Sequence, residues 1–341
     1  MDNIVTIGIV GYGTIGQELA HDLSDKGKQI YVVDSNSAAL DRAVTAGKFS
    51  GVYESIGQLP DGLHAIVEGV PEVPDLKAGV MQQIDAAADP ETYILTVSST
   101  MPSSSFAGLV SNPARLMNAH VLPDLHYRRF VELQGPGDHT DRDAMDYLKQ
   151  QFEGLDFHVC MVNGESPGFL VNRMWHSLMF ATFELLKTYT PIEVDFAVHK
   201  YLGVPYGPCM SMDMIGYDTL FNVFSRVQES MGIPIPDHVR QMHDSGSLGL
   251  KTGSGFFVYE SCDYSGLHAA AKSSLSEHKD EPIEQIASAV WANITQSAAQ
   301  LVGDPNNPQD AQEVRKAVKF GFPIHLDPFN DLQPEWKVLD E

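Results

Sequence analysis

The stretch that decides the fold lies near the N-terminus and reads Thr6-Ile7-Gly8-Ile9-Val10-Gly11-Tyr12-Gly13-Thr14-Ile15-Gly16. Its first five residues are mostly apolar, which is typical of a short buried strand. An amphipathic run through Leu19 and Leu23 follows the last glycine and indicates a helix. Strand, glycine-rich turn and helix in direct succession predict a binding site for a dinucleotide.

The three glycines of this turn each have a physical role in such a site. Gly11 permits the tight turn, Gly13 lets the backbone approach a pyrophosphate, and Gly16 lets the helix pack on the strand. The helix N-terminus offers its amides and its dipole to the anion. We therefore expect six residues of the turn to bind the cofactor: Gly11, Tyr12, Gly13, Thr14, Ile15 and Gly16.

A second expected strand, residues 29–33, ends at Asp34. A carboxylate at this place can accept hydrogen bonds from both ribose hydroxyl groups and would repel a 2′-phosphate. Asp34 therefore predicts NAD rather than NADP as the cofactor.

Strands and helices continue to alternate after this unit. We expect strands at residues 65–67 and 93–97 with a helix at 74–87 between them. A helix at 142–152 and a strand at 157–162 would close the domain. Strands separated by helices predict an α/β Rossmann fold with a doubly wound parallel sheet.

Composition and charge limit the possible partners. The chain has 341 residues, enough for two or three domains, and 43% of them are hydrophobic, as in a globular protein. A formal net charge of -23 would repel nucleic acid and anionic bilayers, so we expect neither as a partner. The N-terminus has no leader pattern, and the 3 cysteines lack a C-x-x-C spacing. We therefore expect a cytoplasmic protein.

Over most of its length the chain resembles the 3-hydroxyacyl-CoA dehydrogenase family. The similarity rests on an ordered series of segments: Gly11 to Gly16, Val67 to Glu72 with Lys77, Val97 to Thr100, His120 with Val131-Glu132, Ser166 to Arg173, and Leu250 to Phe257. The family implies a Rossmann domain followed by an all-α domain of the 6-phosphogluconate dehydrogenase C-terminal type. It also implies an NAD-dependent oxidoreductase of fatty acid metabolism that interconverts a 3-hydroxyacyl substrate and its 3-oxo form.

The resemblance implies a role for each matching residue. His120 would be the general base that takes the hydroxyl proton, and Glu132 would orient its imidazole and stabilise the charged form. Ser99 and Asn172 would hold the substrate oxygens. Four residues would lie near the cofactor: Glu72, Lys77, Ser99 and Lys251.

The chemistry of the reaction supports the choice of a histidine. A secondary alcohol must lose its proton as hydride leaves, and an imidazole paired with a carboxylate can accept that proton near neutral pH. A metal cluster of His120, Asp124 and His126 is the weaker interpretation, because no H-E-x-x-H pattern or cysteine accompanies it. The glycines around Lys251 lack the spacing of a P-loop. Arg128-Arg129 is interpreted as a solvated charge pair, with a substrate carboxylate as the alternative partner.

The chain departs from the family in two places. Between Asp34 and Glu68 it is shorter and lacks the helical hairpin with which family members help to hold coenzyme A. After the base, the family's His-x-x-Asn-Pro becomes His120-Val121-Leu122-Pro123-Asp124, which removes an amide side chain. Both changes indicate a different acyl carrier or a free 3-hydroxy acid, as in the gulonate dehydrogenase branch.

The rest of the chain is predicted to be helical. An apolar run over residues 168–189 predicts a central core helix, and Thr190-Pro191-Ile192-Glu193 predicts a capped helix that ends near Gly203. A similar signature recurs at Asn307-Pro308-Gln309-Asp310, which opens a helix that ends at Gly321, after a helical run over 281–301. The tail is therefore interpreted as a degraded copy of the second domain.

This interpretation sets the expected domain organisation. We expect a Rossmann domain at 1–163, a helical domain at 164–260 and a degenerate half-repeat at 278–341, with residues 261–279 as the connection. In single-copy relatives the helical domain pairs with that of a second subunit. The extra half would occupy that surface, so we expect a monomer or a weak homodimer.

Two rival functions stay open. The fold could persist in a nucleotide-binding or crystallin-like structural protein, although such a protein has no need for Ser99, His120, Glu132 and Asn172 together. Another Rossmann dehydrogenase could act on a 2-hydroxy or cyclic acid, such as a prephenate-like substrate. NADH formation with a panel of 3-hydroxy substrates would separate these functions.

Overall fold

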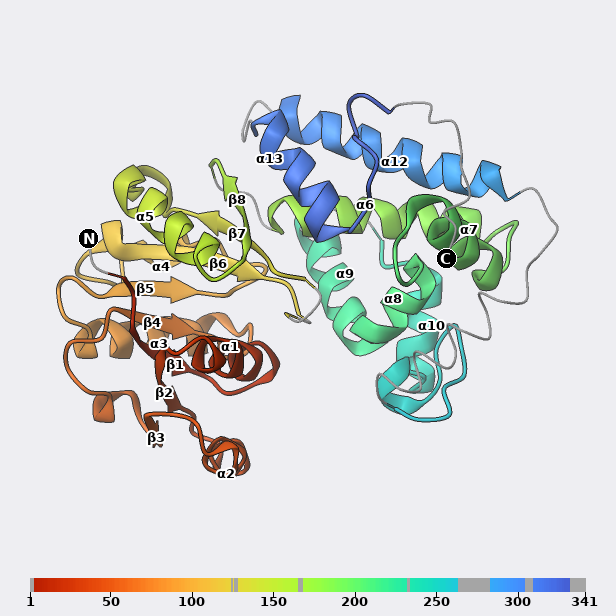
Figure 1. Ribbon diagram of the computed structural model, residues 1–341. Helices are drawn as coiled ribbons and strands as arrows, with labels where there is room; N and C mark the ends of the chain where they lie inside the picture. The colour runs from red at the N-terminus through yellow and green to blue at the C-terminus, as the bar shows by residue number, and fades with distance from the viewer. Residues whose placement is uncertain are drawn as a thin grey trace. The chain divides into compact units, whose positions relative to one another are not determined.

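The computed structural model describes residues 3–123, 125, 128–164, 168–231, 234–262, 283–303 and 309–331. The chain forms two compact units (Figure 1). The first consists of residues Met1–Arg173 with Gln300–Gly321, and the second of Met174–Ala299 with Phe322–Glu341. Asp124, His126, Ser166, Pro167 and the pair Asn307-Pro308, all named above, lie outside the described residues, as does most of the expected connection at 261–279.

The first unit is built on an eight-stranded sheet with the strand order β3-β2-β1-β4-β5-β6-β7-β8. In this order the strands are Gly51–Tyr53, Gln29–Val33, Thr6–Val10, Ala65–Glu68, Tyr93–Thr96, Leu116–Val121, Phe130–Gln134 and His158–Val162. All neighbours are parallel except β6 and β7, which are antiparallel. The expected doubly wound Rossmann fold is therefore confirmed, with one antiparallel pair that the alternation pattern did not predict.

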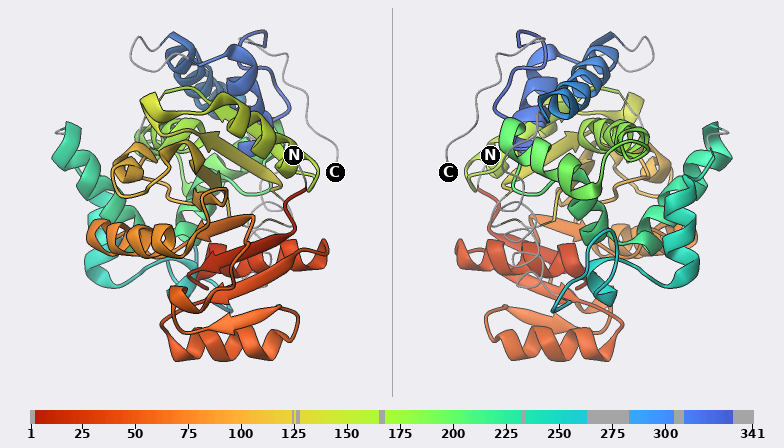
Figure 2. Two further views of the ribbon diagram at one scale, coloured as in Figure 1. Left: turned by 90° about the vertical axis from the view of Figure 1, so that its left-hand side faces the viewer. Right: turned by 90° about the vertical axis from the view of Figure 1, so that its right-hand side faces the viewer.

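Helices lie on both faces of this sheet (Figure 1; Figure 2). One core cluster contains buried residues of α1 (Thr14–Asp25), α2 (Ser37–Ala46) and α5 (Arg142–Glu153). The other contains those of α3 (Pro74–Ala87) and the short α4 (Ser104–Ala107). Three short 3-10 turns connect these elements: Ile56–Gln58, Pro113–Arg115 and Gly137–His139. The sequence pattern located β1, β2, β4, β5 and β8, because strands buried on both faces are nearly continuous apolar runs, but it did not predict β3, β6 and β7.

The segment after Asp34 contains no helical hairpin among its described residues, as the sequence predicts. Between β2 and β4 the described chain contains the single helix α2, the short strand β3 and one 3-10 turn. Asn36 caps α2 by accepting hydrogen bonds from the amides of Ala38 and Ala39, and Gly47 ends it in the left-handed conformation with φ 66°. A 10-residue helix stopped in this way leaves no room for a helical hairpin.

The second unit is helical, as expected. Its helices are α6 (Phe169–Leu185), whose first turn belongs to the first unit, α7 (Pro191–Leu202), α8 (Pro208–Ile215), α9 (Tyr217–Met231), α10 (Asp237–Ser245) and α12 (Glu284–Gly303), with a 3-10 turn at Leu250–Thr252. Helix α6 ends four residues earlier than predicted, because residues 186–189 close a turn on Thr182, Glu184 and Leu185. The predicted cap of α7 is confirmed: Thr190 and Glu193 form a capping box, with proline at the first position.

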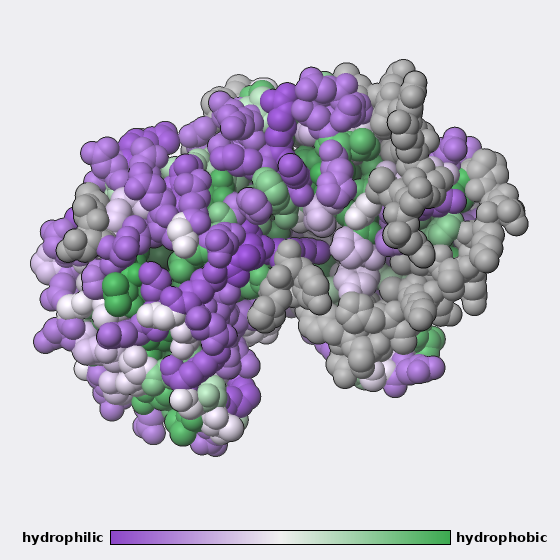
Figure 3. Space-filling view, in the orientation of Figure 1, coloured by the Kyte–Doolittle hydropathy of each residue, from purple (hydrophilic) through white to green (hydrophobic). Residues whose placement is uncertain are grey.

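The last described elements return to the first unit. Asp310 caps α13 (Ala311–Lys316), which continues as a π-helical turn over Ala317–Gly321. The helical stretch ends at Gly321, as the sequence predicts, but the cap is Asp310, the last residue of the signature, rather than Asn307 at its start. No described helix has the length and apolar character needed to cross a membrane. In the view of Figure 3 the described surface is largely hydrophilic, in keeping with the 45 acidic residues of the chain.

Candidate active site

The glycine turn at the carboxyl end of β1 has the geometry that a dinucleotide requires. Gly11 has φ 96°, and a Cβ atom there would lie 2.7 Å from the carbonyl oxygen of Gly69 on the loop after β4. A Cβ atom on Gly16 would overlap the carbonyl oxygen of Gly11, so α1 packs directly on the turn. Beside Gly13, in contrast, nothing lies within 4 Å of the place of a Cβ atom. The backbone is therefore open to a pyrophosphate at Gly13 and closely packed on either side.

Asp34 lies next to this turn at the end of β2. Its carboxylate accepts hydrogen bonds from the amide of Tyr12 at 2.7 Å and from the amide of Asn36 at 2.8 Å. One bond to each oxygen leaves acceptor capacity on both, as ribose hydroxyl groups need. The phenol of Tyr12 is buried and bonded to His21 Nε2 at 2.7 Å, so Tyr12 faces the cofactor side through its backbone. The exposed Thr14 and half-buried Ile15 complete the start of α1, which has no side-chain cap. These residues fit NAD.

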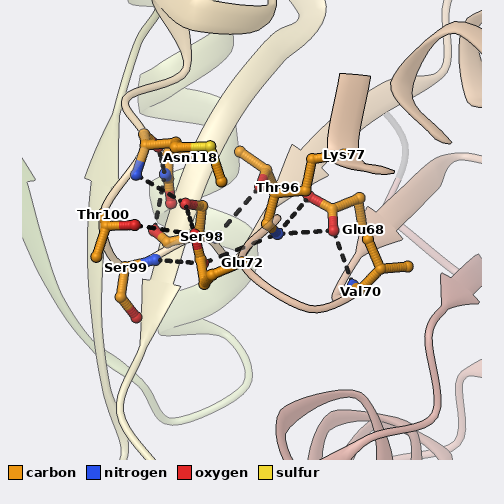
Figure 4. Close-up of polar contacts among 10 residues, drawn as sticks. Glu68, Val70, Glu72, Lys77, Thr96, Ser98, Ser99, Thr100 and Asn118 are labelled. Carbon is orange, nitrogen blue, oxygen red and sulfur yellow. Dashed lines mark hydrogen bonds and ion pairs between the residues drawn. The ribbon is translucent and has the colours of Figure 1, made fainter. Parts of the chain in front are cut away.

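Glu72 holds the loop that follows β5 (Figure 4). Its carboxylate accepts hydrogen bonds from the amide of Ser99 at 3.0 Å and from the hydroxyl groups of Ser98 at 2.9 Å and Thr100 at 3.0 Å. Asn118, on β6, holds the same loop by donating to the carbonyl oxygens of Ser98 at 3.0 Å and Met101 at 3.3 Å. The position of half-buried Ser99 is thus fixed from the loop after β4, through Glu72, and from β6, through Asn118.

Beneath this loop lies a buried ion pair that the sequence did not predict. The ammonium group of Lys77 lies 2.8 Å and 3.0 Å from the two carboxylate oxygens of Glu68, and the side chains are 1% and 0% exposed. The amide of Val70 and the hydroxyl of Thr96 also donate to Glu68. Lys77 reaches Glu72 only at 3.8 Å. Lys77 is therefore placed under the loop, where its contact is with protein carboxylates.

His120 and Glu132 are opposite each other in the antiparallel pair β6–β7. His120 Nδ1 lies 2.8 Å from one carboxylate oxygen of Glu132, and the side chains are 2% and 0% exposed. The second oxygen of Glu132 accepts hydrogen bonds from the amides of Leu170 at 2.8 Å and Val171 at 3.2 Å. These amides belong to the first turn of α6, whose positive end favours a buried carboxylate. We refer to His120 and Glu132 as the dyad.

The chain turns sharply into α6 beside the dyad. Gly168 and Phe169 have φ values of 86° and 52°, and the ring of Phe169 stacks on that of His120 with the centroids 4.6 Å apart and 13° between the planes. A positive φ at a phenylalanine is uncommon, and such strain clusters at functional sites. Asn172 follows in the same turn of the helix and is half-buried.

Of the residues expected near the cofactor, Lys251 alone lies in the second unit, and its ammonium group pairs with Asp218 at 2.6 Å. The sequence did not predict two buried carboxylates of this unit. Asp213 accepts hydrogen bonds from the amides of Phe256 and Phe257 and from the phenol of Tyr259. It therefore fixes the end of the segment Leu250 to Phe257, the last one that resembles the family.

Asp195 is the second of these carboxylates, and it accepts hydrogen bonds from the amides of Cys209 and Met210 at 2.8 Å each. Burial raises its pKa to about 7, against the lowering effect of these two amides. In sequence each acid is flanked by apolar residues, in Val194-Asp195-Phe196 and Met212-Asp213-Met214, which is the signal that could have drawn attention to them.

Arg129 and His120 each have a carboxylate partner within the first unit. Arg129 forms a bidentate pair with Asp22 at 2.7 Å and 3.2 Å and lies over the ring of Phe157, so it ties elements of the first unit together. In the described ranges no three His, Cys, Asp or Glu side chains cluster in a way that could hold a metal ion. His120 instead has a carboxylate partner, as an acid–base residue needs.

Comparison with known families agrees with the fold. Residues 52–165 match the model of the 3-hydroxyacyl-CoA dehydrogenase NAD binding domain, and residues 168–259 match that of the 3-hydroxyacyl-CoA dehydrogenase C-terminal domain. Residues 7–58 match the TrkA-N domain. The first two matches together cover more than half of the chain, so this protein belongs to the 3-hydroxyacyl-CoA dehydrogenase family. It is an NAD-dependent oxidoreductase of the kind that acts on a CH–OH group.

Individual relatives extend this result. The 5-formyl-3-hydroxy-2-methylpyridine 4-carboxylate 5-dehydrogenase of Mesorhizobium japonicum is 24% identical over 75% of this chain and 91% of its own. The (S)-3-hydroxybutyryl-CoA dehydrogenase PaaH1 from Ralstonia eutropha is 26% identical, covers 76% of this chain and 100% of its own, and has a TM-score of 0.63. The 3-hydroxybutyryl-CoA dehydrogenase of Escherichia coli shares the fold over 96% of this chain and 91% of its own, at 17% identity and a TM-score of 0.77.

Proposed function

We propose that His120 is the general base of this dehydrogenase and that Glu132 orients it. The observation that carries the proposal is the buried dyad, with Nδ1 of His120 on one oxygen of Glu132 and two main-chain amides on the other. A carboxylate held by two donors is fixed in place and remains an acceptor toward the imidazole. It therefore favours the tautomer with a proton on Nδ1, which leaves Nε2 free to take the substrate proton.

The surroundings of the dyad suit this step. As His120 takes the proton its imidazole becomes cationic, and the adjacent carboxylate of Glu132 stabilises that charge in a site from which water is excluded. The stacked ring of Phe169 limits rotation of the imidazole. NAD held at the glycine turn and Asp34 would supply the acceptor for the hydride of the carbinol carbon.

The remaining roles follow the family resemblance. Ser99 and Asn172 would hold the substrate oxygens, and the Ser99 loop is held for this by Glu72. The glycine turn from Gly11 to Gly16, with Asp34, would bind the adenosine and pyrophosphate parts of NAD. Lys77 and Lys251 would act near the cofactor, Lys77 from below the loop through its proximity to Glu72.

We propose further that the substrate is a free hydroxy acid or an acyl group on a carrier other than coenzyme A. The shortened segment between β2 and β4 favours this choice, because the described residues there contain one helix and no hairpin. The basic residues of this segment are Arg42 and Lys48. Lys48 is paired with Asp25 at 2.6 Å, which further reduces the positive charge available to CoA phosphates. One relative is, by its name, a dehydrogenase of a free pyridine carboxylate.

NADH formation with matched substrates tests this proposal. We expect turnover with a 3-hydroxy acid such as gulonate or 3-hydroxybutyrate, and weak turnover with 3-hydroxybutyryl-CoA. A kcat/KM for 3-hydroxybutyryl-CoA in the range of dedicated dehydrogenases would overturn the choice of carrier. Absence of turnover with every 3-hydroxy substrate, despite NAD binding, would favour the structural or 2-hydroxy acid alternatives.

We also propose that the chain is a monomer or a weak homodimer of the cytoplasm. The core of the second unit includes Ile283, Ile286 and Ala287 around the start of α12. Ser297 on the same helix bonds to Ser177 on α6 at 2.8 Å. The tail thus covers helices that single-copy relatives would use for pairing. Light scattering that gives a tight dimer, with cross-links through residues 168–189, would refute this part of the proposal.

A further inference from the structure

The outer edge of β8 is covered by a segment that lies outside all the family matches. β8 is the last strand of the sheet, and no strand within the described ranges pairs with its second edge. Helix α13 and the turn that follows it, residues 311–321, belong to the same unit and pack against this strand. An uncovered edge of this kind is a liability, since its amides and carbonyl groups need partners.

Three side chains supply those partners at alternate residues along the edge. The amide group of Gln309 accepts from the amide of Asn163 at 3.0 Å and donates to its carbonyl oxygen at 2.6 Å. Glu313 accepts from the amide of Met161 at 2.8 Å. The ammonium group of Lys316 donates to the carbonyl oxygen of Val159 at 3.1 Å and to Glu313 at 2.8 Å.

The spacing of these side chains explains how a helix can replace a strand. Glu313 and Lys316 are three residues apart in α13, so they share one side of the helix, and Gln309 lies just before the N-cap Asp310. Residues 159, 161 and 163 present their backbone groups toward the same edge of the strand. The aromatic ring of Phe320 stacks on that of His158 with the centroids 3.6 Å apart, which extends the contact to the start of β8. We call residues 309–320 the edge cap.

The edge cap is linked to the dyad through the sheet. Glu132 on β7 is the register partner of His120 on one side and of Cys160 on the other. The thiol of Cys160 donates to the carbonyl oxygen of Glu313 at 3.4 Å. Because register partners project from the same face of a sheet, imidazole, carboxylate and thiol form a row that ends on α13. Burial raises the pKa of the Cys160 thiol, so it remains a neutral group between Glu132 and the cap.

We propose that Glu313 is a positioning residue for the dyad. By accepting from Met161 and Cys160 at the same time, it fixes β8 beside β7 and thereby fixes the carboxylate of Glu132 against His120. The dyad's catalytic role belongs to the proposed function, and the positioning role of Glu313 rests on it. A misplacement of a catalytic group by about 1 Å can cost about 100-fold in rate.

Steady-state kinetics of three variants of the full chain test this role. Glu313→Ala removes the acceptor for the Met161 amide, and we expect kcat to fall by about 10- to 100-fold with a shifted pH profile of kcat. The Kd for NAD should stay within twofold, because the glycine turn is untouched. Glu313→Gln keeps an acceptor oxygen and should restore most of the kcat. Gln312→Ala, an exposed residue of the same helix, is the matched control and should behave as the parent.

Each outcome decides between a positioning and a merely structural role. If Glu313→Ala lowers the melting temperature but leaves kcat and its pH profile unchanged, the positioning role is wrong. If Glu313→Ala does not fold, Lys316→Met serves instead, because it removes the ammonium group that lies 2.8 Å from the Glu313 carboxylate and so loosens the hold of that carboxylate on the Met161 amide. It should lower kcat in the same direction by a smaller factor, and an unchanged kcat would overturn the proposal. His120→Gln, measured alongside, separates the two ideas, since retained turnover there would contradict the proposed function whatever Glu313 does.

Discussion

Replacing Glu132 by Gln is the most informative single change, because it alters one atom's hydrogen-bonding character in the dyad. The amides of Leu170 and Val171 both donate to one oxygen of the side chain. They would hold the carbonyl oxygen of the glutamine in that place and direct its NH₂ group toward His120. His120 Nδ1 would then have to accept a hydrogen bond, which puts the ring proton on Nε2. That tautomer has no free lone pair for the substrate proton.

The size of the effect follows from this geometry. A wrong tautomer at a histidine base costs about 10,000-fold in kcat in the serine protease triad, where an aspartate was changed to asparagine. We expect a loss of about 1,000- to 10,000-fold here, equivalent to about 4–5.5 kcal/mol of transition-state stabilisation. Loss of charged hydrogen bonds should lower the free energy of unfolding by about 1–3 kcal/mol, which the protein should tolerate. The assay is NADH formation at saturating substrate, with the Kd for NAD measured in parallel.

A matched control makes the result interpretable. Glu153→Gln is the same chemical change at the exposed end of α5, where the carboxylate pairs with Lys149 at 2.9 Å. It should leave kcat within twofold, because an exposed pair contributes little. If Glu132→Gln folds and keeps a kcat within tenfold of the parent, with the same pH profile, the tautomer argument is refuted.

Further changes address the cofactor turn, the buried ion pair and the second unit. Gly13→Ala should keep the free energy of unfolding, because the added Cβ meets no protein atom within 4 Å. It should raise the Kd for NAD at least tenfold, because the same Cβ would occupy the space expected for the pyrophosphate. Gly16→Ala should instead destabilise the fold by about 1–3 kcal/mol in urea titrations, since its Cβ meets backbone. Lys77→Met should cost about 3–5 kcal/mol in the same titration by leaving Glu68 buried without its cation, and a loss below 1 kcal/mol would contradict this. The pKa of Asp195 is about 7 in the fold, above its ordinary value of 3.8, so the folded protein binds this proton more tightly than the unfolded chain does. The stability that results is fully present below about pH 4 and is lost as the pH rises to 7. That change amounts to about 4 kcal/mol at most, and Asp195→Asn should flatten the pH dependence of unfolding in this range; an unchanged slope would argue against it.

The sequence predicted those elements whose structural signals all lie within a short stretch of the chain. Strand β2 and helix α3 have the predicted bounds because apolar alternation, Pro74 at the helix start and the glycine turns are all local signals. The cap of α7 is equally local, since Thr190 and Glu193 satisfy each other. The roles of Gly11 and Gly16 in packing could also be predicted, because they follow from the lack of a Cβ atom.

What the sequence did not predict depends on contacts between distant residues. The antiparallel direction of β7 cannot be recognised from a strand buried at every position. The pairing of Lys77 with Glu68 arises where α3 follows the end of β4, nine residues along the chain, and the sequence did not predict it. Glu313 reaches Met161 across 152 positions of sequence, so no local pattern indicates that the tail covers β8. The roles of the candidate site residues and the domain limits at 163 and 260 stay predictions.

The central claim is that an imidazole held by a buried carboxylate takes the substrate proton in a protein that binds NAD at its glycine turn. Pre-steady-state NADH formation by His120→Gln, together with its Kd for NAD, tests this most directly. We predict that NAD binding stays within twofold of the parent while the rate of the chemical step falls by about 100- to 10,000-fold. A variant that binds NAD and transfers hydride within tenfold of the parental rate would contradict the account.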